Sequence, residues 1–333
     1  MIDPRFTEPR EETLAALRAC PGDVVVLGAG GKMGPSVTAM LTRAVDELGD
    51  RRRVIAVSRW SDRAAESALA ALGVTTVECD LLNSAAVDAL PDAPNVIFMA
   101  GQKFGSADRP AVTWAMNTVA PANAARRYAA SRIVAFSTGN VYPLTPVASG
   151  GPRETQQVAP VGEYAMSCVG RERVFEYFSG VHGTRVAIVR LNYAIDVRYG
   201  VLLDLAQRVA AGEAIPLAMG YVNVIWQNDA NRIAIECLPR AAAPVYVLNV
   251  TGRDTLSIRE LAERFGRRLG REPVFTGAES RDALLSNADL LHSTFTPPAT
   301  SVEQMIEHVA AAVEQHAPTL GKPTHFETRD GRF

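Results

Sequence analysis

Lysine is nearly missing from this chain. It occurs only at positions 32, 103 and 322, and arginine supplies the rest of the 34 basic residues. A catalytic lysine therefore has few possible positions. The chain also lacks an excess of either charge, because its formal net charge is −2. A nearly balanced surface does not favour nucleic acid or an acidic membrane as a partner, and we expect neither.

Cysteine and histidine are scarce as well. The four cysteines lie far apart and form no metal-type pairs, which predicts reduced, mostly buried thiols in a cytoplasmic protein. No cluster of His, Asp and Glu has metal-ligand spacing, so we expect no metal. The N-terminal residues contain no apolar signal core, and no later run approaches the roughly 20 apolar residues of a membrane span.

The segment VVVLGAGGKMG, residues 24–34, is the most informative part of the chain. Its apolar start is typical of a buried parallel strand. Gly28 permits a tight turn, Gly31 lets the backbone approach a pyrophosphate, and Gly34 allows a helix to pack closely on the strand. The spacing is G-x-x-G-x-x-G rather than G-x-G-x-x-G, so a glycine-rich turn without ligand is the alternative. The strand–turn–helix setting, with a helix from Pro35 to about Leu48, favours a dinucleotide site.

Apolar, β-rich runs alternate with helical patterns through most of the chain. Strands alternating with helices of this length predict an α/β fold with a doubly wound, parallel, Rossmann-type sheet and a smaller C-terminal substrate lobe. The expected strands are 24–28, 54–58, 75–79, 95–100, 132–137, 185–191 and 245–250, and the expected helices between them are 35–48, 62–72, 84–90, 110–130 and 164–179.

The domain boundaries follow from a change of rhythm after Leu191. We expect a lead-in and short helix over 1–20, a dinucleotide-binding domain over 21–190 plus 245–250, and a substrate lobe over 191–244 plus 251–333. The stretch 139–160 is rich in Gly, Pro and Ser, a composition that suits a loop over an active site.

Seven motifs in order resemble the extended short-chain dehydrogenase/reductase superfamily, specifically its NAD-dependent epimerase/dehydratase family, from about Val24 to Val313. They read LGAGGKMG, CDLLN, FMAGQKFG, AMNTVAPANAARRY, FSTGNVYP, EYAMSCVGRERV and YVLNVTGRDTLSIRELAERF. The resemblance implies a catalytic tyrosine at Tyr164, a catalytic hydroxyl at Thr138, and Asn117 on the helix between. The cofactor contacts, from the loop and the resemblance together, are Gly28, Gly31, Lys32, Met33, Gly34, Ser58, Arg59, Asp80, Leu81, Ala100, Gly101, Lys103 and Asn117.

One motif residue departs from the family pattern. The family's lysine, four residues after the tyrosine, is Cys168 here, and residues four apart lie on one face of a helix. In the family the lysine charge favours the phenolate, which a neutral thiol does not. We interpret Cys168 as an inert buried side chain. Lys103 is the one lysine placed to approach the cofactor or tyrosine, and a solvated loop lysine is the alternative.

The end of the second expected strand bears on the choice of cofactor. Relatives that prefer NAD end this strand with an acid that binds the ribose hydroxyls. Here the strand ends Val57-Ser58-Arg59-Trp60 without an acid. Ser58 and Arg59 suit a 2′-phosphate, which predicts a preference for NADP(H) with NAD(H) possible. The alternative is that Arg59 belongs to a solvated loop.

The substrate signal is weaker. Nucleotide-sugar relatives carry an arginine shortly before a Val-Asp-Asp segment, whereas this chain has Tyr221 and then Trp226-Gln227-Asn228. A free sugar, sugar acid or keto acid is at least as well supported as a sugar diphosphate. Asn192 and Tyr221, with Thr138, are the candidate substrate contacts.

Two functions remain open on the sequence. The first is a nicotinamide-dependent oxidoreductase or epimerase/dehydratase-like enzyme acting on a small carbohydrate-like alcohol or ketone, with Tyr164 and Thr138 handling the proton. The second is a catalytically silent NAD(P)-binding sensor or scaffold, suggested by the missing lysine. By analogy with relatives, we expect a homodimer formed through the helices at 110–130 and 164–179.

Overall fold

The computed structural model describes residues 2–103 and 105–332, and the chain divides into two compact units. The first comprises Met1–Thr138, Gly162–Arg190 and Asn231–Leu248. The second comprises Gly139–Val161, Leu191–Ala230 and Asn249–Phe333. Relative to the expected boundaries, 139–161 and 249–250 belong to the second unit and 231–244 to the first.

A seven-stranded parallel sheet forms the core of the fold, which confirms the predicted fold class. The strand order is β12-β7-β5-β4-β1-β2-β3, so successive strands are added on one side of β1 as far as β3 and on its other side from β4 onward. The boundary between β1 and β4 is the topological switch point, where doubly wound sheets bind ligands. All four residues of β1 are buried, as its continuous apolar run predicts. The strands are β1 Val24–Leu27, β2 Val54–Ser58, β3 Thr75–Glu78, β4 Asn95–Phe98, β5 Arg132–Thr138, β7 Arg185–Leu191 and β12 Tyr246–Val250.

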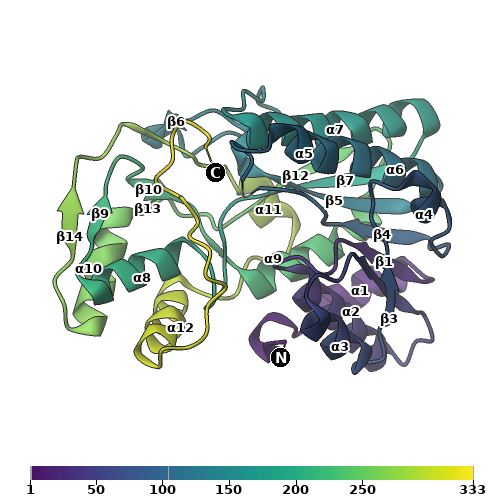
Figure 1. Cartoon of the computed structure of the whole chain (residues 1–333), viewed down its shortest axis with the longest axis horizontal. Coiled ribbons are helices and arrows are strands. Elements are labelled where there is room, and N and C mark those ends of the chain that lie inside the picture. Colours follow the sequence, from purple (N-terminus) through teal and green to yellow (C-terminus); the bar gives the residue numbers. More distant parts are fainter. Residues whose placement is uncertain (1, 104, 333) are drawn as a thin grey trace. The chain divides into compact units, whose positions relative to one another are not determined.

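Helices cover both faces of this sheet, and Figure 1 shows α5, α6 and α7 on the side opposite to α1, α2 and α3. On one face, the Phe98 ring of β4 meets the Phe175 ring of α7 edge-on, with centroids 5.4 Å apart. A π-helical turn, Ala115–Val119, joins α5 to α6. The helices of the first unit are α1 Glu11–Ala19, α2 Gly34–Leu48, α3 Arg63–Ala70, α4 Ser84–Asp88, α5 Pro110–Trp114, α6 Ala120–Arg127, α7 Glu163–His182 and the C-terminal part of α9 Gln227–Glu236.

The second unit is built from helices and very short strand pairs. Its helices are α8 Val201–Ala211, α10 Ile258–Leu269, α11 Asp289–Thr294 and α12 Val302–Glu314. Its short strands are β6 Thr145–Pro146, β8 Ala194–Ile195, β9 Ala214–Pro216, β10 Tyr221–Val222, β11 Ile225–Trp226, β13 Leu256–Ser257, β14 Val274–Thr276 and β15 Asp282–Ala283. Within the described residues, no helix is long and apolar enough to span a membrane.

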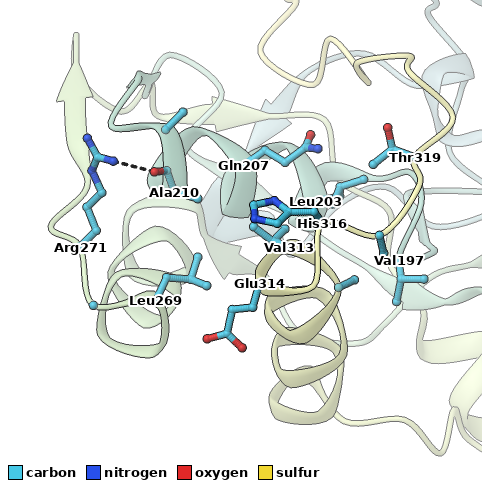
Figure 2. Close-up of a pocket in the computed structure, with 14 residues that line it drawn as sticks. Val197, Leu203, Gln207, Ala210, Leu269, Arg271, Val313, Glu314, His316 and Thr319 are labelled. Atoms are coloured by element: carbon cyan, nitrogen blue, oxygen red, sulfur yellow. Dashed lines mark hydrogen bonds between the residues drawn. The ribbon is translucent and has the colours of Figure 1, made fainter.

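The second unit contains a cavity of about 870 Å³ beside α8 and α12. Figure 2 shows Leu203 and Gln207 of α8 and Val313 of α12 on its wall, with Arg271 donating to the Ala210 carbonyl at 2.7 Å. None of the residues that the sequence motifs single out lines this cavity. Tyr164, Thr138 and Asn117 belong instead to the first unit, which contains the sheet.

A buried ion pair fixes α7 on the sheet. Glu172 of α7 pairs with Arg190 of β7 at 2.7 Å, and the two side chains are only 1% and 5% exposed. Ser137 of β5 donates to the same carboxylate at 2.6 Å. Breaking a buried pair leaves an uncompensated charge, which makes this contact a strong constraint on the position of α7.

We expect Arg190→Met to lower the free energy of unfolding by about 3–5 kcal/mol, because Glu172 would lose its buried partner. The matched control is Arg173→Met. Arg173 pairs with Glu176 on the exposed face of α7, so its removal should change stability by no more than about 0.5 kcal/mol. Urea denaturation measures both values, and equal losses would contradict this account of how α7 is held.

Candidate active site

The glycine-rich loop after β1 has the close packing that its sequence predicts. Gly28 has φ +91°, and a Cβ there would lie 2.6 Å from the Ala100 backbone nitrogen. A Cβ on Gly34 would lie 2.3 Å from the Ala29 carbonyl oxygen. Only glycine permits these approaches, which bring the loop against the turn after β4 and against the start of α2.

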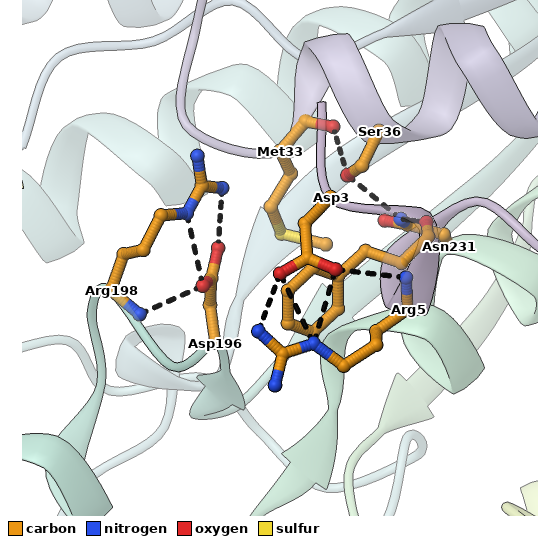
Figure 3. A network of polar contacts seen from close by, with 8 residues as sticks. Asp3, Arg5, Met33, Ser36, Asp196, Arg198 and Asn231 are labelled. Carbon is orange, nitrogen blue, oxygen red and sulfur yellow. Dashed lines mark hydrogen bonds and ion pairs between the residues drawn. The ribbon is translucent and has the colours of Figure 1, made fainter. Parts of the chain in front are cut away.

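The start of α2 is tied to the N-terminal segment. Asn231 donates from Nδ2 to the Phe6 carbonyl and to Ser36 Oγ, both at 2.9 Å, and Ser36 donates to the Met33 carbonyl (Figure 3). Phe6 is fully buried, and Asp3 accepts from the Arg5 backbone nitrogen at 2.9 Å to begin a short 3₁₀ turn, Pro4–Phe6. The first turn of α2 is thus held by Asn231 and the N-terminal segment, which lie outside the glycine-rich motif. Met33 is buried and Lys32 half-buried beside it.

The residues after β2 differ in exposure. A Cβ on Gly30 would lie 2.6 Å from Ser58 Oγ, so Ser58 lies against the glycine-rich loop. Trp60 is buried with φ +48°, an uncommon conformation for a bulky residue, and its Nε1 donates to the Val77 carbonyl at 3.0 Å. Arg59 between them is exposed and forms no ion pair within the described residues.

The residues after β3 lie at the same carboxyl edge of the sheet. Asp80 is exposed and accepts from the Leu82 backbone nitrogen at 3.0 Å. Leu81 is buried, and its carbonyl accepts from Asn123 of α6 at 2.9 Å. The exposed carboxylate is therefore positioned by its own turn rather than by an ion pair.

Asn117 connects three elements from within the π-helical turn. Its Oδ1 accepts from the Gln102 backbone nitrogen at 3.0 Å, and its Nδ2 donates to the Gln102 carbonyl at 3.1 Å. Nδ2 also donates to Ser167 Oγ at 2.8 Å and contacts Cys168 Sγ at 3.9 Å. Because π-helical turns recur at functional sites, this placement adds to the case for Asn117.

Tyr164 lies half-buried in the first turn of α7, where it forms side-chain hydrogen bonds with Thr138 and with Cys168. Lys103 Nζ lies 5.9 Å from the centroid of its ring. Burial raises the pKa of the Tyr164 hydroxyl, while Arg171 and the bond with Thr138 act in the opposite direction. The structure therefore brings together the tyrosine, hydroxyl, asparagine and cysteine that the motifs single out.

Sequence reasoning missed Arg171. This residue is only 6% exposed, and it donates from Nη2 to Asn117 Oδ1 at 2.5 Å and from Nη1 to the Phe136 carbonyl at 2.8 Å. A Cβ on Gly101 would overlap Nη2, so the guanidinium lies against the turn after β4. The available signal was an arginine seven residues after Tyr164, on the same helix face.

Of the candidate substrate residues, Thr138 lies in the first unit, and Asn192 and Tyr221 lie in the second. Asn192 is buried, and its side chain and Ser286 Oγ lie 3.0 Å from where a Cβ on Gly139 would be. Asn192 Nδ2 and Ser286 Oγ are buried without a hydrogen-bond partner. Tyr221 packs on a small apolar cluster that includes Met219. Unsatisfied buried donors of this kind call for an explanation, and a bound oxygen atom would supply one.

The thiols are not activated as thiolates, although Cys168 contacts Tyr164 and Asn117. All four cysteines are buried free thiols, and burial raises the pKa of each: Cys20, Cys79, Cys168 and Cys237. Across the described ranges, no group of three or more His, Cys, Asp or Glu side chains is arranged to hold a metal ion.

Comparison with protein families identifies one family over more than half of the chain. The model of the NAD dependent epimerase/dehydratase family matches residues 24–218. Comparison with curated proteins gives no match.

Solved structures share the fold at low identity. UDP-Glc/GlcNAc 4-epimerase from Campylobacter jejuni has a TM-score of 0.71 and 21% identity, covering 89% of this chain and 100% of its own. The WbmG enzyme from Bordetella bronchiseptica, solved with NAD and UDP, has a TM-score of 0.72 and 17% identity, and the match covers 90% of this chain and 97% of that one. UDP-glucose 4-epimerase from Thermotoga maritima, solved with UDP-glucose, has a TM-score of 0.69 and 17% identity, and the match covers 88% of this chain and 99% of that one.

Proposed function

Because the chain belongs to the NAD-dependent epimerase/dehydratase family, we propose that it is a nicotinamide-dependent oxidoreductase or epimerase/dehydratase-like enzyme acting on a small carbohydrate-like alcohol or ketone. The observation that carries the proposal is the convergence of Tyr164, Thr138 and Asn117 at the carboxyl edge of the sheet. Ligands bind at this edge in doubly wound folds.

The glycine-rich loop fits a dinucleotide. The approaches at Gly28 and Gly34 leave backbone rather than side chains facing the start of α2, whose amides favour a pyrophosphate. Asp80, exposed after β3, would contact the adenine end. When bound, a nicotinamide dinucleotide supplies the hydride donor or acceptor. The residues that would hold it are Gly28, Gly31, Lys32, Met33, Gly34, Asp80, Leu81, Ala100, Gly101, Lys103 and Asn117.

We propose NADP(H) as the preferred form, with NAD(H) also bound. Ser58 lies against the loop, and Arg59 is exposed without an ion pair in the described part of the chain. An arginine that no carboxylate engages is available to a 2′-phosphate. The family description and the NAD in the Bordetella complex support the NAD(H) alternative.

Tyr164 is proposed as the general acid and base. Its hydroxyl is hydrogen-bonded to Thr138, so both groups can contact one substrate oxygen while Tyr164 gives or takes the proton. Asn117 holds the backbone of the turn after β4 on one side and Ser167 of α7 on the other. It would thereby fix the helix that carries the tyrosine.

Asn192 and Tyr221 are proposed as substrate contacts. Within the second unit and among the described residues, Asn192 Nδ2 and Ser286 Oγ are unsatisfied donors beside Gly139. They suit a hydroxyl, carbonyl or carboxylate oxygen, and Tyr221 is the third candidate contact. The neighbours bind UDP or UDP-glucose, so UDP-glucose belongs in any substrate panel beside free sugars, sugar acids and keto acids.

A homodimer is proposed through α5, the π-helical turn and α7. These elements pack together. Four of their large apolar side chains are 37–47% exposed to solvent: Val112, Trp114, Val119 and Met166. Trp114 is fixed by donation to Glu163 at 2.6 Å. An exposed apolar group on adjacent helices is the usual mark of an interface.

We expect Tyr164→Phe to lower turnover by about 10²–10⁴-fold, because the proton would lose its donor and acceptor. The dissociation constant for NADPH should stay nearly unchanged. Tyr177→Phe, at an exposed position of the same helix, is the control and should leave both quantities as they are. Nicotinamide absorbance follows net oxidation or reduction over the substrate panel, and chromatography of the products follows epimerisation or dehydration, in which the cofactor is regenerated. Full activity of Tyr164→Phe would remove this residue from the mechanism, and dinucleotide binding without turnover in the wild type would favour the silent sensor.

Arg59→Ala should weaken NADPH binding by about tenfold or more while changing NADH binding much less, because only NADPH carries the 2′-phosphate. Arg51→Ala, exposed at the opposite end of β2, is the matched control. Fluorescence titration gives the four affinities. Equal effects of Arg59→Ala on both cofactors would overturn the NADP(H) preference.

Sedimentation should give a dimer for the wild type and a monomer for Met166→Glu, because a carboxylate in the centre of an apolar interface is costly to desolvate. Leu72→Glu changes an equally exposed apolar residue after α3 and should leave the dimer intact. A monomeric wild type would refute the proposed interface.

A further inference from the structure

Arg171 carries a buried charge one helical turn beyond Cys168. Residues three apart share a helix face, so Tyr164, Cys168 and Arg171 follow one side of α7. The guanidinium reaches Asn117 Oδ1 at 2.5 Å and the Phe136 carbonyl at 2.8 Å. Its Nε, the guanidinium nitrogen attached to the side-chain stem, has no hydrogen-bond partner among the described residues. Within the same residues, the cation contacts two neutral oxygens and the Phe98 ring, whose centroid lies 5.9 Å from Cζ.

No carboxylate within the described residues pairs with Arg171. Glu172 is adjacent in sequence, but adjacent helical residues point in different directions. Its carboxylate is taken by Arg190 at 2.7 Å and by Ser137 at 2.6 Å. A buried cation without a counter-ion is costly, and such groups concentrate where function requires a charge.

The charge acts on the groups at the start of α7. Burial raises the pKa of Tyr164 and of Cys168, and Arg171 opposes both increases. The close approach to Gly101 puts the guanidinium against the turn after β4, beneath the backbone that Asn117 also holds. The cation thus lies among the residues assigned to the proton and to the cofactor.

We propose that Arg171 is a positioning residue that supplies, from the next turn of α7, the positive charge that Cys168 cannot supply to Tyr164. It also orients Asn117 through the bond to Oδ1. The inference rests on the proposed acid–base role of Tyr164, because a charge beside the phenol matters only if the phenol exchanges a proton. Replacing one lysine by an arginine three residues later would preserve the electrostatics of the site without preserving the motif.

Other groups also face Tyr164 and enter the test. Lys103 approaches from the turn after β4, Thr138 from the end of β5, and Cys168 from the same helix. Glu172 lies one residue beyond Arg171 and is paired. Among these groups, Lys103 is the one that carries a positive charge, as Arg171 does. The experiments therefore change Arg171 and keep Lys103, so that only one of the two charges is removed.

The first experiment needs no substrate. Cys168→Lys is made in the wild type and in Arg171→Met, and the melting temperatures are compared as a double-mutant cycle. We expect Cys168→Lys to lower the melting temperature by about 5 °C or more when Arg171 is present and by much less when it is absent, because two buried cations repel. In the extreme case, Cys168→Lys would fail to fold in the wild-type background, whereas the double variant Cys168→Lys/Arg171→Met would fold, and this would also support the proposal. Equal decreases in both backgrounds would show that the charge of Arg171 is not felt at position 168.

The second experiment measures the pH dependence of kcat/KM on the substrate for which Tyr164→Phe lowers turnover. Arg171→Met should lower kcat/KM in the oxidative direction by about 10–100-fold and move the profile to higher pH by about one unit, since the phenolate loses a stabilising charge. Arg171→Lys keeps the charge and should keep the profile. Arg173→Met is the surface control on the same helix.

The proposed function and the role proposed for Arg171 are refuted by different results. If Tyr164→Phe is fully active, the proposed function fails, whatever the melting temperatures show. If Tyr164→Phe is inactive but Arg171→Met keeps the wild-type profile, the role given to Arg171 is wrong. Loss of activity in Arg171→Lys equal to that in Arg171→Met, with no change of profile, would mean that Arg171 only maintains structure.

Discussion

The hydrogen bond from Arg171 to Asn117 is the interaction on which the candidate site depends. It joins α7 to the π-helical turn, and the same guanidinium reaches β5 through the Phe136 carbonyl. Asn117 then fixes the turn after β4 through both backbone groups of Gln102. Three elements that are remote in sequence are thereby held around Tyr164 by one cation and one amide. A buried charge without a counter-ion costs free energy of folding, and a preorganised charge beside a reacting group stabilises charge that develops there. The proposed site is therefore electrostatic as well as steric.

The two neighbouring charges on α7 have opposite consequences. Glu172 and Arg190 neutralise each other and fix the helix on the sheet, whereas no carboxylate in the described part of the chain pairs with Arg171. The separation follows from helix geometry, since successive residues point in different directions. One charge therefore contributes to stability and the next to the field around Tyr164. The substitution of cysteine for lysine at position 168 is then compatible with a working site.

Much of the fold could be predicted from the sequence because its signals are local. Continuous apolar runs mark the buried parallel strands, and Gly28 and Gly34 mark close backbone approaches that depend only on a missing side chain. The family resemblance likewise implies that Tyr164, Thr138 and Asn117 belong to one site. Arg171 could not be predicted, because its proposed role depends on contacts with Asn117 and Phe136. Both residues are more than 30 positions away in the sequence, and no local spacing indicates such contacts. The two- and three-residue strands of the second unit are too short to show a period, and the membership of 139–161 depends on tertiary contacts.

The proposed function and the role proposed for Arg171 both require a nicotinamide dinucleotide at the carboxyl edge of the sheet, beside Tyr164. The first measurement is a calorimetric titration of the purified wild-type protein with NADPH and, separately, with NADH. We expect saturable binding of about one NADPH per chain. Absence of binding by NADPH, and equally by NADH, would mean that the fold persists without its cofactor, and it would contradict both the enzyme proposal and the role assigned to Arg171.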